Sequence, residues 1–161
     1  MTLSSHLESL DACPEAREWA AGYSTLAEAW TACDRADWLL WYAGRHGDVD
    51  RRLLVRAACA CARTALPHVP PGEDRPRLAI ELAEAWCNGR ATIVEVRTAA
   101  NAAANAANAA ADAAYAAAYA ATADAAAADA ADADADAAAR SKAHLEMCVL
   151  VRALIPCPSE P

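Results

Sequence analysis

A long alanine-rich stretch constrains the fold of this chain more than any other feature. From Thr92 to Ala139 the sequence contains neither Gly nor Pro, and 29 of the 41 residues from Ala99 to Ala139 are Ala. Alanine has the highest intrinsic helix propensity, and Thr92 followed by Glu95 predicts a capping box at the helix start. The sequence therefore predicts an all-α fold: a multi-helix bundle with a long Ala-rich C-terminal helix or a kinked helix pair.

The residues that interrupt the first part of this Ala tract form a regular stripe. They are spaced alternately four and three positions apart, which places them on one side of a helix. We favour a solvated face, because polar side chains are mostly exposed; a buried polar ladder that binds a neighbouring helix or a ligand is the alternative. The stripe consists of Asn101, Asn105, Asn108, Asp112, Tyr115, Tyr119 and Thr122.

The Ala tract is too long to be one straight helix inside a small domain. A single helix from Thr92 to Ile155 would span about 96 Å at 1.5 Å per residue. A compact chain of this length has a radius of gyration of only about 15 Å. We therefore expect one helical domain over residues 1–161, with a break or sharp kink between Thr122 and Asp136. One long protruding helix, or pairing with a second copy of the chain, is the alternative.

Shorter helices are predicted before the tract. Pro14 suits a first helical position, and Thr25 with Glu28 predicts a second capping box. Asp50 is a further helix start, and residues 1–12 are predicted to be a loose lead-in.

Large apolar residues mark the faces of these helices that should be buried. Trp38, Trp41 and Tyr42 share one face of a helix that Gly44 is expected to end. In a later helix, Leu78, Leu82 and Trp86 are candidates for burial. The final segment is predicted to be an amphipathic helix, in which Leu145, Cys148 or Val149, Arg152 and Ile155 recur at helical spacing.

Net charge and cysteine content limit the classes of partner and compartment. The net charge is −8 and the pI is near 4.9. Such a chain repels nucleic acid and anionic membranes, so we expect neither as a direct partner; a basic protein is favoured, although the charge also provides solubility. The N-terminus lacks a signal-peptide pattern, and seven cysteines are an odd number, so free thiols in the cytoplasm are expected.

No residue pattern predicts catalysis, a cofactor or a metal. His144 and Cys148 are four apart, but no second ligand pair accompanies them. The sequence also lacks a nucleophile elbow and a phosphate-binding Gly loop, so we expect a non-enzymatic protein. An arginine stripe could bind phosphate, but pairing with the protein's own carboxylates is favoured. It is formed by Arg52, Arg56 and Arg63.

Two segments carry a family resemblance: DWLLWYAG at Asp37–Gly44 and RRLLVRAACACARTALPHVPPGEDRPRLAIELAEAW at Arg51–Trp86. With the Ala/Asp/Tyr tract that follows, they resemble a family of small bacterial and phage proteins described as immunity proteins of polymorphic toxin systems. The resemblance covers the chain from about Leu26 to its end. It implies neutralisation of a toxin by binding, and it points to a polar–aromatic cluster of Asp37, Trp38, Trp41 and Arg56. A buried Trp core beside a paired Asp and Arg is the alternative.

Two functional hypotheses follow. In the first, the chain binds a toxin or defence factor, and an acidic array steers a basic partner toward it. In the second, a phage anti-defence protein acts as an acidic decoy or sequesters a nucleotide at the Arg52–Arg63 face. The array lies toward the C-terminal end of the Ala tract, where the helix macrodipole disfavours negative charge, so its retention favours a role in recognition over helix stability. Its partner-binding candidates are Asp129, Asp132, Asp134 and Asp136.

Overall fold

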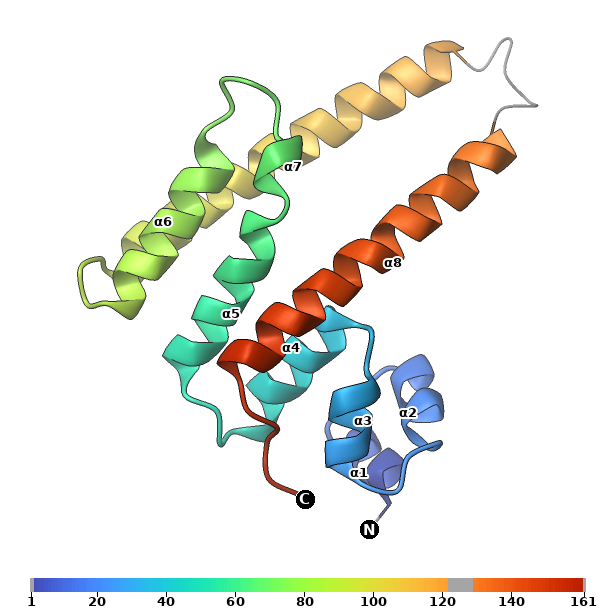
Figure 1. Cartoon of the computed structure of the whole chain (residues 1–161). Helices are drawn as coiled ribbons and strands as arrows, with labels where there is room; N and C mark the ends of the chain where they lie inside the picture. The colour runs from blue at the N-terminus through green and yellow to red at the C-terminus, as the bar shows by residue number, and fades with distance from the viewer. Residues whose placement is uncertain (1, 122–128, 161) are drawn as a thin grey trace. The chain divides into compact units, whose positions relative to one another are not determined.

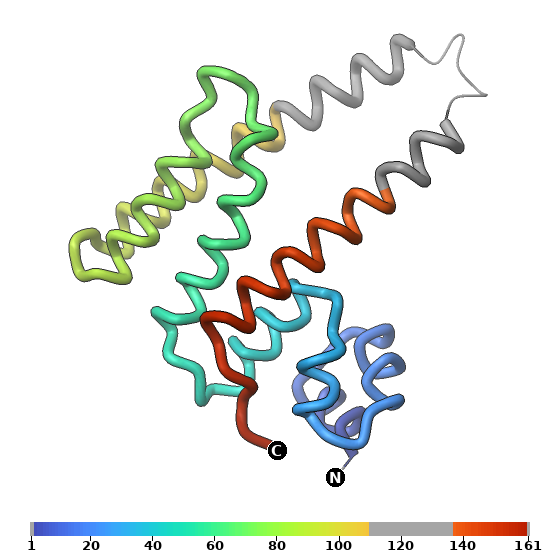
Figure 2. The backbone as a smooth tube through the Cα atoms, viewed as in Figure 1, coloured from blue at the N-terminus to red at the C-terminus, as the bar shows by residue number. Residues whose placement is uncertain are grey.

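The computed structural model describes the backbone of residues 2–121 and 129–160, and the side chains of residues 2–109 and 137–160 (Figure 1, Figure 2). This part of the chain is built from eight α-helices and one 3-10 helix and contains no strand, which confirms the all-α prediction. The helices are α1 (Leu3–Ser9), α2 (Pro14–Ala20), α3 (Leu26–Ala32), α4 (Ala36–His46), α5 (Arg51–Arg63), η1 (Leu66–His68), α6 (Arg75–Cys87), α7 (Ile93–Ala121) and α8 (Asp129–Leu154).

The chain divides into two compact units. Unit 1 contains residues 1–61 and 144–161, and unit 2 contains residues 62–143. A single domain over residues 1–161 stays a prediction.

The first helix of unit 1 replaces the loose lead-in that was predicted for residues 1–12. The Thr2 hydroxyl accepts a hydrogen bond from the Ser5 amide at 3.2 Å and caps α1. Leu3 and Leu7, four residues apart, are both buried. The prediction was wrong because α1 is only seven residues long and depends on this burial for its stability.

Local capping signals were predicted correctly. Pro14 is the first residue of α2. The Thr25 hydroxyl accepts a hydrogen bond from the Glu28 amide, and the Glu28 carboxylate accepts one from the Thr25 amide, which completes the capping box of α3. At the start of α5, Asp50 Oδ1 accepts a hydrogen bond from the Arg52 amide at 2.7 Å.

Helix α4 is longer than predicted. It continues through Gly44 to His46, and the chain leaves the helix at Gly47, whose φ of 86° is left-handed. Gly44 serves close packing instead, because a Cβ there would lie 3.2 Å from Leu54 Cδ2. The glycine that ends the helix is therefore the next one in the sequence, where positive φ is required.

The core of unit 1 combines α3, α4 and the end of α8. Cys148 and Val151 of α8 and Ile155, the residue after it, are fully buried, whereas Leu145 and Val149 are exposed. Of the residues predicted to recur at helical spacing, Cys148 and Ile155 are therefore buried and Arg152 is half-buried, whereas Leu145 is exposed, as is Val149, the alternative to Cys148. Arg152 fixes this helix to the end of α3, because its guanidinium donates to the backbone oxygens of Trp30 and Cys33. These carbonyls would otherwise lack partners at the helix end. The other large buried side chains of this core are Leu3, Leu7, Leu26, Trp30, Leu39 and Tyr42.

Unit 2 is organised by the packing of α6 along α7 (Figure 1). The predicted capping box starts α7. The Thr92 amide donates to the Glu95 carboxylate at 2.7 Å, and the Glu95 amide donates to the Thr92 hydroxyl at 3.3 Å. The less exposed face of α7 repeats every three or four residues and ends at the buried Ala106; it contains Val96, Ala99, Ala103 and Ala106.

The polar stripe lies away from that face. Asn101, Asn105 and Asn108 are exposed, which confirms the solvated reading for these three residues. The side chains of Asp112, Tyr115, Tyr119 and Thr122 lie outside the described residues.

Helix α6 buries a different face from the one predicted. Ile80 and Cys87 are buried and Ala83 is half-buried on the same face, whereas Leu78 is 45% exposed and Leu82 and Trp86 are half-buried. The predicted Leu78–Leu82–Trp86 face was wrong, because which residues face a neighbouring helix depends on how the two helices pack.

The Ala tract contributes to two helices. Helix α7 is described up to Ala121 and α8 from Asp129. The part of the predicted break region at 129–136 is helical, and the rest, residues 122–128, lies outside the described residues. In the described part of the chain, no helix is both long and apolar enough to cross a membrane.

Candidate binding site

Unit 1 contains a cavity of about 480 Å³ whose walls are α1, α2, α3 and α4. Its interior is apolar because the buried residues Leu3, Leu7, Leu26 and Leu39 line it. Exposed residues such as Asp11 and Cys13 also line it, so the cavity is accessible from solvent. Its volume lies in the range of small-molecule and anchor-residue pockets, about 300–1,000 Å³.

Aromatic side chains dominate the cavity wall. Four of the five tryptophans in the chain line it, from three different helices. Trp30 is buried, whereas the other three are half-buried, and the rings of Trp19 and Trp38 lie 5.7 Å apart. Tryptophan surfaces of this kind contribute much of the binding energy at protein interfaces. The four are Trp19, Trp30, Trp38 and Trp41.

An arginine–aspartate pair lies at the cavity wall. Arg35 Nε and Nη2 donate to the two carboxylate oxygens of Asp37 at 2.9 and 2.7 Å. The guanidinium also lies 4.8 Å from the Trp38 ring centroid, within cation–π distance. Hydrogen bonds from Arg35 lower the pKa of Asp37, so this carboxylate is charged at neutral pH. His144 Nδ1 is a further neighbour, 3.8 Å from Asp37 Oδ1.

Asp11 reaches the cavity from a backbone conformation that usually selects glycine. Its φ is 62°, and it follows the end of α1. The Asp11 amide donates to the Glu8 carbonyl and the Ala12 amide donates to the Leu7 carbonyl, both at 3.0 Å. This is a Schellman motif with aspartate at the left-handed position. Aspartate tolerates this region better than most residues, but less well than glycine.

The structure brings together three of the four residues that the family resemblance indicated. Asp37, Trp38 and Trp41 all line the cavity. Arg56 is an exposed residue of α5 and is not part of the cavity wall. The arginine paired with Asp37 is instead Arg35, two residues before it.

The acidic candidates lie elsewhere. Asp129, Asp132, Asp134 and Asp136 are in the first two turns of α8, and their side chains lie outside the described residues. The expectation that they lie toward the C-terminal end of a longer Ala-rich helix depends on residues 122–128, which are outside the described residues.

Sequence reasoning missed several cavity residues. Asp11, Cys13, Trp19 and Trp30 line the cavity but were not site candidates. A signal existed for α1, because Leu3 and Leu7 are four residues apart and suit one helix face. The convergence of four short helices on one cavity has no comparable signal in the sequence.

A second polar cluster fastens the C-terminal tail to unit 1. Asp48 binds His46 Nδ1 at 3.0 Å and accepts hydrogen bonds from the Ser159 amide at 3.1 Å and the Ser159 hydroxyl at 2.5 Å. Catalytic Ser–His–Asp sites require the serine to bind the histidine. Here the hydroxyl donates to the carboxylate, so the arrangement serves as a structural latch.

Among the described side chains, those of residues 2–109 and 137–160, no three from His, Cys, Asp or Glu lie close enough to hold a metal ion.

Comparison with known proteins gives one match. A family model described as "Imm-5 like putative immunity protein" matches residues 45–139, more than half of the chain. No curated protein and no solved structure matches the chain. The matched segment includes Arg56 but begins after Asp37, Trp38 and Trp41, so the cavity is formed by residues that precede it.

Proposed function

This chain belongs to the Imm-5 like putative immunity protein family, and from that premise we propose that it neutralises a protein toxin by direct binding, without catalysing a reaction. The family match is the observation that carries the proposal. An immunity protein needs a surface that holds its toxin, and binding energy at such surfaces concentrates in a few aromatic and arginine residues.

The cavity of unit 1 supplies a surface of this kind. Half-buried tryptophans surround an apolar interior, and a charged pair stands beside them. Asp37, Trp38 and Trp41 are therefore the partner-binding residues we propose there. Arg56 on α5 and the four aspartates of α8 are candidates for a wider contact.

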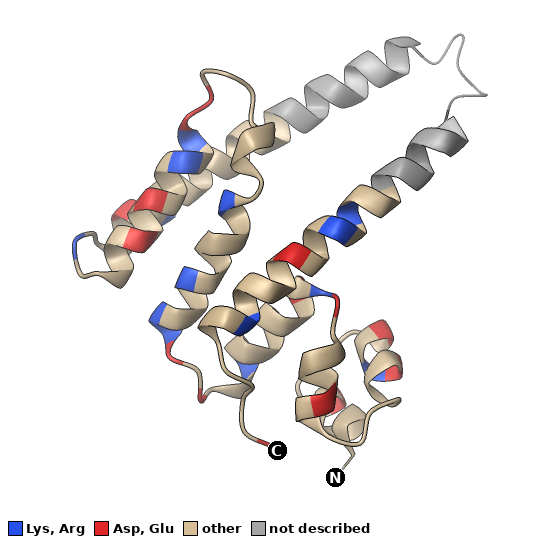
Figure 3. Ribbon diagram, in the orientation of Figure 1, with Lys and Arg blue, Asp and Glu red and all other residues tan. Residues whose placement is uncertain are grey.

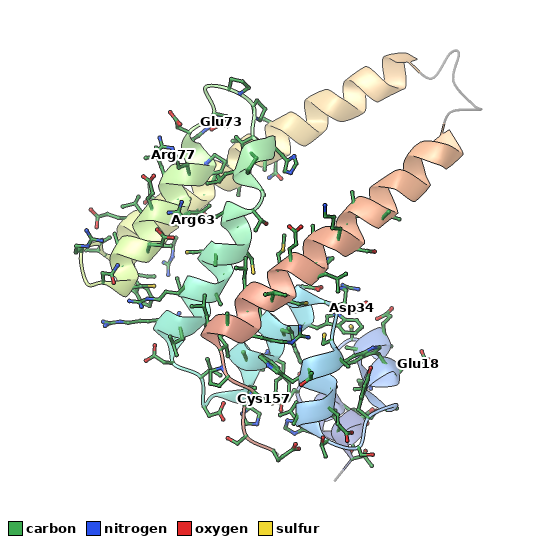
Figure 4. All side chains as sticks on the ribbon, in the orientation of Figure 1. Glu18, Asp34, Arg63, Glu73, Arg77 and Cys157 are labelled. Atoms are coloured by element: carbon green, nitrogen blue, oxygen red, sulfur yellow. The ribbon has the colours of Figure 1, made fainter. Side chains whose placement is uncertain are left out.

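The anti-defence alternative receives less support. It needed either a nucleic-acid-like acidic array or a nucleotide site on the Arg52–Arg63 face. Arg63, labelled in Figure 4, instead makes a bidentate ion pair with Glu84, at 2.8 and 2.7 Å. One arginine of that face is therefore already occupied within unit 2.

Growth rescue tests the proposal. Toxin candidates encoded in the same locus are expressed with and without this chain, and rescue is expected for one of them. The rescued toxin should copurify with the chain and keep its intact mass, because binding leaves it unmodified. Rescue of none of the toxins would contradict the immunity function, and a changed toxin mass would contradict the non-enzymatic mechanism.

A further inference from the structure

We infer that the cavity of unit 1 anchors a basic segment of the toxin, which inserts an apolar side chain between the tryptophans and places an Arg or Lys beside Asp11 and Asp37. This inference rests on the proposed function and specifies the chemistry of the partner. Three features of unit 1 support it: the apolar interior, the acidic surroundings and the backbone conformation of Asp11.

The interior suits an apolar side chain. The lining residues from α1 and α3 are leucines, alanines and a buried tryptophan, and they leave about 480 Å³ accessible from solvent. Filling this space with an apolar group removes apolar surface of both partners from water, which is favourable. A central aromatic-lined pocket is the usual place for such an anchor.

The surroundings of the cavity are strongly acidic. Residues 1–46, which include the four helices of the cavity wall, contain seven carboxylates and three arginines, and acidic residues are visible on α2 and α3 in Figure 3. Arg17 lies 2.9 Å from Glu8, Arg35 forms the bidentate pair with Asp37, and Arg45 lies 5.8 Å from the Trp41 ring centroid. A basic partner would be attracted to this surface and an acidic one repelled.

Several of these carboxylates gather near the cavity. Asp11 and Asp37 line it, and Glu15 and Asp34 interact electrostatically with Arg35. The local charge around the Arg35 guanidinium therefore stays negative. A second copy of this chain would bring the same acidic surface and an anionic lipid surface would bring like charge, so a basic protein segment is the occupant that fits.

Asp11 provides an independent argument. Its left-handed position in the Schellman motif is easiest for glycine, yet this position of the cavity wall carries a charged residue. Strained residues often persist where they serve a site. In this interpretation the backbone strain is tolerated because the carboxylate meets a cation of the partner.

Binding kinetics of the full-length chain with the toxin recovered by growth rescue test the inference. Asp11→Asn removes the charge and keeps a residue that tolerates positive φ, so the fold should persist. We expect it to weaken binding about three- to tenfold, with a smaller salt dependence. Trp38→Ala should weaken binding about thirtyfold or more.

Glu18→Gln is the matched control. Glu18 is an exposed carboxylate of α2 in the same unit but is not part of the cavity wall (Figure 4). Its loss should change affinity less than twofold. If Glu18→Gln and Asp11→Asn weaken binding equally, only the overall charge matters and the anchor site is contradicted. Unchanged binding by Trp38→Ala also contradicts it, while rescue by the wild type still supports the immunity function.

A displayed library of 12-residue peptides gives a test that needs no toxin. The full-length chain is the bait, and Trp38→Ala serves as counter-selection. Enriched sequences should combine an aromatic residue or Leu with Arg or Lys within four positions. Uncharged apolar sequences would contradict the basic partner and favour an apolar ligand. Dimerisation that Trp38→Ala abolishes would identify a second copy as occupant and also contradict the inference.

Discussion

The two units of this chain are both helical but are stabilised by side chains of very different size. Unit 1 buries Trp, Tyr, Leu, Val and Ile, whereas the described part of unit 2 packs α6 on α7 mainly through Ala, with Ile80 and Cys87 as its larger buried side chains. Large side chains bury much area each but fit imperfectly around one another, and unit 1 retains a cavity. Alanines bury little area each but allow close helix contact. We therefore expect the stability of unit 1 to depend on single large side chains and that of unit 2 on many small contacts.

The largest effect should come from truncating a core residue of unit 1. Trp30 is only 5% exposed and lines the cavity. Trp30→Ala should lower the free energy of unfolding by about 3–5 kcal/mol, the usual cost of removing a buried aromatic side chain. Urea unfolding monitored by circular dichroism measures this change. Trp41→Ala should cost less, because Trp41 is half-buried. A loss below about 1 kcal/mol for Trp30→Ala would contradict the importance of single large residues in unit 1.

In unit 2 the informative change is an enlargement. Ala106→Leu places a bulky side chain on the buried face of α7 and should destabilise the protein by about 1–3 kcal/mol, because overpacking separates close helices. Ala104→Leu, at an exposed position of the same helix, is the control and should be nearly neutral. Urea unfolding of both variants gives the comparison. Equal changes in the free energy of unfolding of the two variants would mean that α7 is not closely packed at Ala106.

Local and non-local features of the fold differed in how well the sequence predicted them. The Thr25–Glu28 and Thr92–Glu95 capping boxes were predicted correctly, because each depends on residues three apart. The prediction of the buried face of α6 was wrong, because choosing Ile80 over Leu78 requires knowing the shape of α7.

In the candidate site, too, the sequence indicated some residues and not others. The resemblance gave Asp37, Trp38 and Trp41, which do line one cavity. Asp11 and Trp19 could not be added without the packing of α1 and α2 against α4. The pairing of Asp37 with Arg35 rather than Arg56 is a matter of side-chain geometry that spacing does not reveal.

Alkaline pH should affect unit 1 through its buried thiols. Burial raises the pKa of Cys148 from 9.0 to about 11, and burial also raises the pKa of Cys33 and Cys61. Each raised pKa contributes stability that is present below pH 9 and is lost as pH rises through the folded-state value, because only the unfolded thiol ionises in that window. Cys148 should therefore account for a loss of about 1–2 kcal/mol between pH 9 and 11.

Unfolding free energies of the wild type and Cys148→Ala across this pH range measure that loss. The variant should show a smaller decline, and Cys33 and Cys61 should account for part of what remains. An identical decline in the two proteins would mean that Cys148 is not protected from ionisation in the folded state.

A smaller effect of opposite sign is expected at Asp11. Asp11→Gly relieves the left-handed strain and should raise the free energy of unfolding by about 0.5–1 kcal/mol. The same change should weaken toxin binding, because it removes a carboxylate from the cavity. Thermal unfolding and binding kinetics measure the two effects. A variant that gains stability and keeps full affinity would show that Asp11 is not retained for the partner.

The smallest effect on stability should come from the acidic start of α8. Replacing Asp129, Asp132, Asp134 and Asp136 with Asn removes four negative charges with little change in volume. If α8 is a separate helix that starts near Asp129, its macrodipole favours these charges, and their removal should cost about 0.5 kcal/mol or less after salt screening. If α7 and α8 were one continuous helix, the charges would lie far from its N-terminus and the change would be neutral or slightly stabilising. Thermal unfolding at low and high salt therefore distinguishes one helix from two.

The same four-Asn variant also tests whether the aspartates serve recognition or solubility. Slower toxin association with a weaker salt dependence supports electrostatic steering. Unchanged kinetics with easier precipitation would mean that the aspartates only keep an Ala-rich segment soluble.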